Sequence, residues 1–201
     1  MKGQSVKFQN EGKKMTVLYI NACVRENSRT EILAQHLIKK LQKPVQQINL
    51  GQIALLPFNL ELLQKRNALI KAGALDDPMF SYAHQFANAS EIVIAAPMWD
   101  LSFPALLKTF IEHINVGGIV FKYSGEGKIV PLCKAKTLYY VTTMGGHHQT
   151  DFGFGYVKTL CNTLYGIDDV RLFKAEGLDI VGNDVSAILE AAEKEMDLLL
   201  G

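Results

Sequence analysis

Short apolar runs alternate along the chain with longer segments in which apolar residues recur three or four positions apart. The short runs are rich in β-branched residues and end at Gly, Pro or polar positions, as strands buried on both faces do. The longer segments have the period of helices that bury one stripe. We expect strands at 15–20, 45–50, 91–96, 136–143 and 170–174, and helices at 28–41, 60–72, 78–87, 103–114, 156–164 and 183–200.

This alternation predicts the α/β fold class, with a parallel sheet covered by helices on both faces. Five strands with a polar loop after the first favour the flavodoxin-like strand order 2-1-3-4-5. Ser28, followed three positions later by Glu31, is expected to cap the first helix. No repeat or linker interrupts the pattern. We therefore expect one domain over residues 15–201 and a disordered N-terminal tail over residues 1–14.

Composition and charge narrow the class of protein. The 201 residues carry 21 Lys and Arg against 20 Asp and Glu, a net charge of +1, so no global field favours nucleic acid or an anionic membrane as a partner. The apolar runs are too short to span a bilayer, and residues 1–14 lack the apolar stretch of a signal peptide. Cys23, Cys133 and Cys161 are an odd number without CxxC spacing, which favours reduced thiols and a cytoplasmic location.

The loops after the first, third and fourth expected strands are candidate ligand-binding segments, because ligands of such sheets bind beyond the carboxyl ends of the strands. The first loop, 21–30, leads into a helix start whose free N–H groups attract an anion. Ser28 and Thr30 add hydroxyl groups, and Arg25 and Arg29 add positive charge. Neither a GxGxxG nor a GxxxxGK[ST] motif is present, which favours a single phosphate, as in FMN. An ordinary capped helix with solvent-facing arginines is the alternative.

The second loop follows the third strand and contains Pro97, Met98, Trp99 and Pro104. The two prolines stiffen the backbone. Met98 and Trp99 have the side chains that pack on a flat conjugated ring. The alternative is that both are ordinary core residues.

The third loop contains Gly145 and Gly146, followed by His147 and His148. Paired glycines permit close backbone approach to a ligand. Two adjacent histidines rarely converge on one ion, and no matching ligand pattern accompanies them, so we expect no metal site.

Taken together, these residues resemble the FMN-dependent NADH:quinone oxidoreductases and azoreductases, from about Met15 to the C-terminus. The family's A-P-M-[YW]-N-F segment, which packs on the isoalloxazine ring, is similar to residues 96–101. Its S-R-G-G loop is similar to residues 143–146, and its S-x-S phosphate loop to residues 28–30. The resemblance implies that the cofactor-binding residues are Ser28, Arg29, Thr30, Pro97, Met98, Trp99, Asp100, Leu101, Thr143, Met144, Gly145 and Gly146.

Three positions depart from the family pattern. Ala22 replaces an early serine of the phosphate loop, Asp100 replaces an asparagine, and Met144 replaces an arginine. FMN binding remains the expectation, and the preferences for nicotinamide and acceptor stay open. Asp100 has two interpretations: an ionised carboxylate there would disfavour anionic acceptors, or it caps the helix that begins near Phe103.

The resemblance implies an oxidoreductase in which NADH or NADPH reduces FMN, and a quinone, azo compound or nitroaromatic then takes the electrons in a ping-pong scheme. His148 is a candidate proton donor, because imidazoles titrate near neutral pH. Cys23 is expected to be a buried thiol. A homodimer with the active site at the subunit interface is also implied.

A non-enzymatic electron carrier of the flavodoxin type is the alternative. Such carriers are usually strongly acidic, whereas this chain is almost neutral. A receiver-type regulator would need acidic residues after the first strand, where residues 21–23 are Asn, Ala and Cys. An iron–sulfur flavoprotein would need a cysteine cluster, and the three cysteines are scattered.

Overall fold

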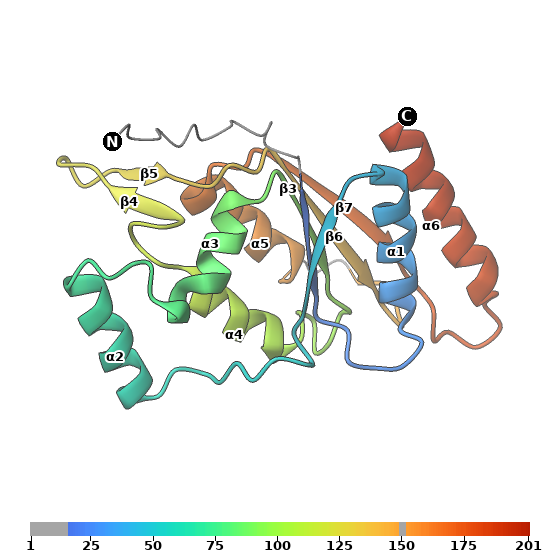
Figure 1. The fold of residues 1–201 in the computed structure, drawn as a ribbon. Coiled ribbons are helices and arrows are strands. Elements are labelled where there is room, and N and C mark those ends of the chain that lie inside the picture. Colours follow the sequence, from blue (N-terminus) through green and yellow to red (C-terminus); the bar gives the residue numbers. More distant parts are fainter. Residues whose placement is uncertain (1–15, 149–151) are drawn as a thin grey trace, which may run out of the picture.

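The computed structural model describes residues 16–148 and 152–201, so the expected tail 1–14 lies outside the described residues. A five-stranded parallel sheet runs through the centre (Figure 1). In chain order its strands are arranged 2-1-3-4-5, so the predicted α/β class and strand order are confirmed. From one edge to the other they are β2 (Val45–Asn49), β1 (Val17–Asn21), β3 (Glu91–Ala95), β6 (Thr137–Thr143) and β7 (Asp169–Ala175).

Helices cover both faces of this sheet, which is why its central strands are almost wholly apolar. All five residues of β1 are buried. On one face lie α1 (Arg29–Leu41) and α6 (Val185–Leu200) (Figure 1). On the other lie α3 (Ser81–Asn88), α4 (Ala105–Ile114) and α5 (Phe154–Leu160).

Successive side chains of the central strands enter two separate cores, because neighbouring residues of a strand point to opposite faces. Leu18 and Ile20 of β1 pack with Phe110 in the core below α3, α4 and α5. Val17 and Tyr19 of the same strand pack in the core below α1 and α6. The sheet therefore separates two apolar cores. The carboxyl ends of its strands, called the carboxyl edge of the sheet below, lie between these cores.

Some elements differ from the sequence-based expectation. An antiparallel hairpin, β4 (Phe121–Tyr123) and β5 (Ile129–Pro131), was not expected, because strands of three residues show no readable period. A 3₁₀ turn, Pro78–Phe80, precedes α3. The helix expected at 156–164 begins earlier, as α5, and continues as a π-helical turn over Cys161–Tyr165.

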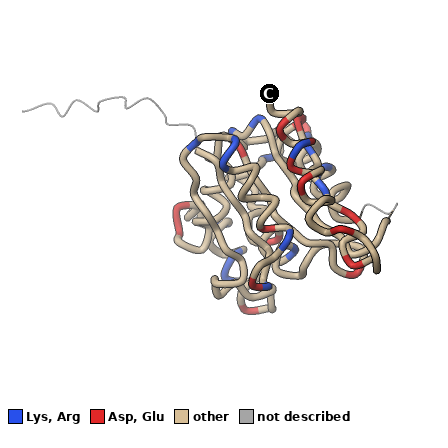
Figure 2. Tube along the Cα trace, turned by 90° about the vertical axis from the view of Figure 1, so that its right-hand side faces the viewer, with Lys and Arg blue, Asp and Glu red and all other residues tan. Residues whose placement is uncertain are grey.

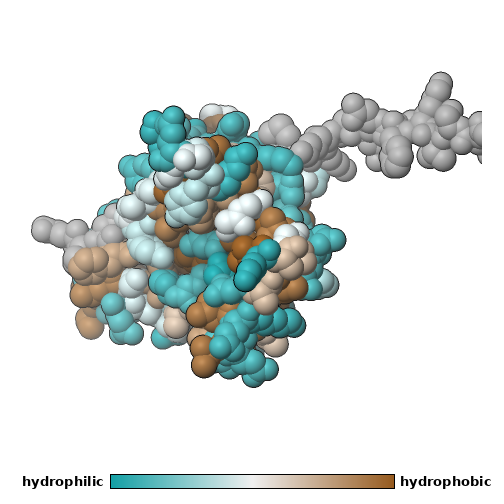
Figure 3. Space-filling model, turned by 90° about the vertical axis from the view of Figure 1, so that its left-hand side faces the viewer, coloured by the Kyte–Doolittle hydropathy of each residue, from teal (hydrophilic) through white to brown (hydrophobic). Residues whose placement is uncertain are grey.

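Helix α2 (Leu60–Lys71) lies at the margin of the core below α3, α4 and α5: it has no buried residue, but Leu69 and Ile70 pack against that core. The side chains of Phe58 and Arg66 tie it to the end of α4: the Phe58 ring stacks on His113 at 4.3 Å, and Arg66 donates a hydrogen bond to the Asn115 carbonyl at 2.5 Å. Leu60 is 71% exposed. On this side of the molecule, apolar side chains are exposed between polar ones (Figure 3).

Charges of both signs are interspersed on the side that carries α1 and α6 (Figure 2). Asp197 of α6 accepts hydrogen bonds from His36 at 2.8 Å and from Lys40 at 3.0 Å, and these bonds lower the pKa of the Asp197 carboxyl. No helix within residues 16–148 or 152–201 combines the length and the apolar character that crossing a membrane requires.

Candidate functional site

A cavity of about 230 Å³ opens at the carboxyl edge of the sheet, between the loops that follow β1, β3 and β6. This is where the strand order reverses, since β1 and β3 are neighbours while the chain visits β2 between them. Four of the expected site residues do not line this cavity: Asp100, Leu101, Gly146 and His148. Nine of the expected cofactor-binding residues do: Ser28, Arg29, Thr30, Pro97, Met98, Trp99, Thr143, Met144 and Gly145.

The first loop is held by the buried side chain of Asn21. Its amide donates a hydrogen bond to Glu31 at 2.9 Å, and its carbonyl oxygen accepts one from the Cys23 backbone N–H at 2.8 Å. The expected capping box is therefore wrong: Ser28 is the residue before α1, but its side chain makes no capping hydrogen bond. Without a side-chain cap, the first N–H groups of α1 can attract an anion.

Ala22, one of the departures from the family pattern, is fully buried in the core and does not line the cavity. Cys23 beside it is also buried, and burial raises the pKa of its thiol to about 11. The expectation of a buried thiol at Cys23 is confirmed. The raised pKa keeps this thiol protonated at neutral pH, and the protonated form is unreactive because the thiolate is the nucleophile.

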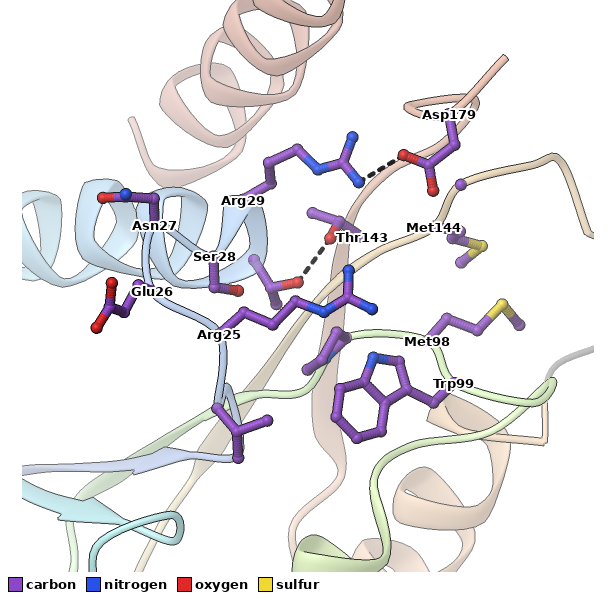
Figure 4. A pocket seen from close by; sticks show the side chains of 14 residues that line it. Arg25, Glu26, Asn27, Ser28, Arg29, Met98, Trp99, Thr143, Met144 and Asp179 are labelled. Carbon is purple, nitrogen blue, oxygen red and sulfur yellow. Dashed lines mark hydrogen bonds and ion pairs between the residues drawn. The ribbon is translucent and has the colours of Figure 1, made fainter.

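A buried hydrogen bond of 2.6 Å joins the hydroxyl groups of Thr30 and Thr143 (Figure 4). Thr30 lies in the first turn of α1, and Thr143 is the last residue of β6. The bond therefore fixes the helix start, where an anion would bind, against the loop that carries Met144 and Gly145.

The second loop is a tight turn that presents Trp99 to the cavity. Trp99 and Ser102 exchange two backbone hydrogen bonds, of 3.0 and 2.9 Å. The two residues between them, Asp100 and Leu101, have φ angles of 50° and 65°, as in a type I′ hairpin turn. The capping hypothesis for Asp100 is wrong, because α4 begins only at Ala105, well beyond this turn.

The third loop is packed against the segment that follows β7. The Asp179 N–H donates to the Gly145 carbonyl at 2.9 Å, and the Gly177 N–H donates to the Gly146 carbonyl at 3.1 Å. A Cβ atom at position 145 would overlap the carboxylate of Asp179, so a larger residue there would displace that side chain. His148 is exposed beside Gly146.

The neighbouring His147 lies with its Nδ1 3.7 Å from a Glu176 carboxylate oxygen. Among the described residues, no group of three or more His, Cys, Asp or Glu side chains is arranged to hold a metal ion.

Charged side chains from two loops meet at the rim of the cavity (Figure 4). Arg29 donates to the Asp179 carboxylate at 2.7 Å and to the Leu178 carbonyl at 2.8 Å. Arg25 extends from the first loop, and its guanidinium lies 5.9 Å from the centre of the Trp99 ring. Asp179 was missed by the sequence interpretation. The usable signal was its place just after the last strand, whose carboxyl end reaches the same edge.

The cavity therefore has an apolar part and a charged part. Pro97, Met98, Trp99 and Met144 supply flat or polarizable surface that suits an aromatic ring. The start of α1, with Arg29, supplies N–H groups and positive charge that suit a phosphate. These residues fit a ligand that carries both groups.

The chain is similar to a family model and to several known proteins. A family model described as a flavodoxin-like fold matches residues 15–200. An FMN-dependent NADH:quinone oxidoreductase of Coprothermobacter proteolyticus is 36% identical over 196 residues, which covers 91% of this chain and 96% of that protein. A protein of the same name from Caldicellulosiruptor saccharolyticus is 34% identical over 194 residues, covering 90% of this chain and 96% of the relative.

Solved structures show the same fold. The azoreductase of Bacillus anthracis str. Sterne superimposes with a TM-score of 0.79 at 21% identity, covering 92% of this chain and 98% of that one. An FMN-dependent NADH-azoreductase from Bacillus anthracis str. Ames Ancestor, in complex with FMN, gives 0.77 at 22% identity, covering 92% and 97%. The described fold, the matched family model and the full-length relatives lead to one conclusion: the chain belongs to the flavodoxin-like family of FMN-dependent NADH:quinone oxidoreductases.

Proposed function

We propose that the chain is an FMN-dependent NAD(P)H oxidoreductase that reduces quinones, azo compounds or similar aromatic acceptors. The observation that carries this proposal is the cavity in which a helix start with Arg29 adjoins the Met98–Trp99 wall. The names of the full-length relatives, FMN-dependent NADH:quinone oxidoreductase, support the same activity.

In this proposal the residues divide by the part of FMN that they hold. Ser28, Arg29 and Thr30 bind the phosphate at the start of α1. Thr143, Met144, Gly145 and Gly146 lie along the polar edge of the ring. Pro97, Met98 and Trp99 pack on the ring, and Asp100 and Leu101 form the turn that orients Trp99.

Bound FMN supplies the hydride chemistry, which no side chain provides by itself. The protein's own part is to hold the ring rigidly and to present one face of it to NADH or NADPH and then to the acceptor. Use of one site by both substrates gives the ping-pong order. The N–H groups of Gly145 and Gly146 stabilise negative charge near them, and His148, exposed beside Gly146, donates a proton to the acceptor.

The proposal includes a cytoplasmic homodimer whose active site lies at the subunit interface. Three unpaired cysteines suit a reducing compartment. Helix α2, which buries no residue within the chain, offers apolar surface for a second copy. Sedimentation at micromolar and nanomolar protein, with NADH oxidation measured at both, tests the dimer. Full activity of a monomer would overturn it.

The test of the activity is the visible spectrum of the purified protein supplied with FMN. We expect a yellow complex that NADH or NADPH bleaches and that a quinone re-oxidises. Trp99→Ala should weaken FMN binding and, with saturating FMN, slow the turnover. Failure of the protein to bind FMN would refute the proposal, whereas FMN binding without direct NAD(P)H oxidation would favour the electron carrier.

A further inference from the structure

We propose that Asp179 competes with the cofactor phosphate for Arg29 and keeps FMN loosely held and exchangeable. This inference rests on the proposed function, since it concerns the same cavity. It adds a role for a residue outside the three loops that the sequence singled out.

Arg29 is bound to the segment after β7 by two hydrogen bonds. One terminal nitrogen of its guanidinium donates to the Asp179 carboxylate at 2.7 Å, and the other donates to the Leu178 carbonyl at 2.8 Å. Figure 4 shows Arg29 pointing along α1 towards Asp179. An entering phosphate must therefore share or replace the Asp179 carboxylate as the partner of this guanidinium.

The backbone at Asp179 is held against the loop that follows β6. The Asp179 N–H donates to the Gly145 carbonyl at 2.9 Å, and the Leu178 N–H donates to the Met144 carbonyl at 3.2 Å. The missing Cβ of Gly145 leaves the space that the carboxylate occupies. Asp179 thus places a carboxylate, 65% exposed, in the wall of the cavity beside Arg29.

The charges that line the cavity cancel. Two are positive, Arg25 and Arg29, and two are negative, Glu26 and Asp179. A phosphate monoester carries about −1.5 to −2 at pH 7, so FMN brings its charge to a wall whose side chains have no net charge, and the start of α1 is the remaining source of positive potential. Of the two carboxylates, Asp179 is the one paired with an arginine, and its negative charge opposes a phosphate at close range.

Neutralising this carboxylate should tighten the binding of phosphate-bearing flavins. Asp179→Asn keeps the size of the side chain and removes the charge. We expect the dissociation constant for FMN to fall on the order of tenfold, equivalent to about 1.4 kcal/mol. Riboflavin, which lacks the phosphate, should bind both proteins equally. The difference for FMN should narrow at high salt, because screening weakens exposed charges.

The experiment titrates the flavin-free full-length chain with FMN and with riboflavin, following the quenching of flavin fluorescence. Glu26→Gln is the matched control: it removes one carboxylate from the same cavity lining, but Glu26 lies away from the Arg29 guanidinium (Figure 4). Its effect on FMN binding should stay below threefold. Asp179→Ser serves as a second variant should the asparagine protein not fold.

Each outcome decides between the alternatives. Equal or weaker FMN binding by Asp179→Asn overturns the inference, and so does an equal gain for riboflavin or for Glu26→Gln. If no protein binds FMN, the proposed function fails, and inorganic phosphate then tests the inference alone. A larger phosphate-induced rise in melting temperature in Asp179→Asn than in wild type supports it, and equal rises overturn it.

Discussion

At the scale of single residues, two residues beside the cavity have backbone conformations that L-residues rarely adopt. Asp100 and Leu101 both have positive φ, and together they turn the chain so that Trp99 lines the cavity. Aspartate tolerates this region through local hydrogen bonding, whereas leucine has no such compensation. Strain of this kind persists where the surroundings enforce it and is concentrated at functional sites.

The strain at Leu101 can be measured by comparing two truncations. Leu101→Ala and Leu101→Gly both remove the side chain, but only alanine keeps a Cβ at a φ of 65°. We expect the glycine protein to be more stable than the alanine protein by about 0.5–1 kcal/mol, since the relief of strain exceeds the entropy that glycine adds to the unfolded chain. Urea denaturation measures the difference, and a more stable alanine protein would contradict it.

The buried hydrogen bond between Thr30 and Thr143 allows a second measurement. Thr30→Val keeps the shape but leaves the Thr143 hydroxyl buried without this partner, which should cost about 1–3 kcal/mol of unfolding free energy. The double variant with Thr143→Val should cost less than the sum of the two single changes. Strict additivity would show that the two hydroxyls do not stabilise each other.

At the scale of elements, the apolar pattern located the strands of the sheet and the helices because burial on one or two faces imposes a period. It failed where burial is slight or the element is short. In α1 the large apolar residue Ile32 is 48% exposed, while the small residue Ala34 is buried. The β4–β5 hairpin was missed for the same reason, since each strand has three residues.

The sequence predicted those parts of the candidate site that directly follow a strand, because the end of a strand determines where the next loop lies. The three loops that the sequence singled out do line the cavity. Asp179 was missed because its approach to Arg29 joins residues 150 positions apart, and no local pattern carries that information. The turn at Asp100 and Leu101 was missed because it lacks the glycine that marks such turns.

Helix α2 should open more readily than the central strands, because none of its residues is fully buried and Arg66 helps to tie it to the end of α4. Arg66 also lies 5.4 Å from the centre of the Phe58 ring, and burial lowers the pKa of its guanidinium. We expect Arg66→Ala to speed amide hydrogen exchange within Leu60–Lys71 while the central strands keep their protection. Lys65→Ala, on the same helix, is the control. Faster exchange throughout the sheet would show instead that α2 supports the whole fold.

At the scale of the whole molecule, the two cores enclose thiols that stay protonated. Burial raises the pKa of Cys23 to about 11 and those of Cys133 and Cys161 to about 12, from an ordinary value of 9.0. The folded chain therefore holds these protons more tightly than the unfolded chain does. The resulting stability is complete below about pH 9 and is lost as the pH rises towards 12.

This linkage predicts a steeper loss of stability in alkali for wild type than for a chain without one buried thiol. Between pH 9 and pH 10, each thiol lowers the unfolding free energy by at most about 1.4 kcal/mol per pH unit. Cys161→Ala should lower stability at pH 7 through its cavity and flatten the slope above pH 9. Parallel slopes for the two proteins would contradict the assignment.

The position of Asp179 late in the chain also bears on how the cavity is assembled. The cavity takes residues from the first loop, at Val24, through to Asp179. The wall behind Arg29 comes into place only when β7 has paired with β6, because Asp179 follows β7 along the chain. Any molecule that fills this cavity thus bridges early and late parts of the chain, and it should hinder the detachment of β7 from the sheet.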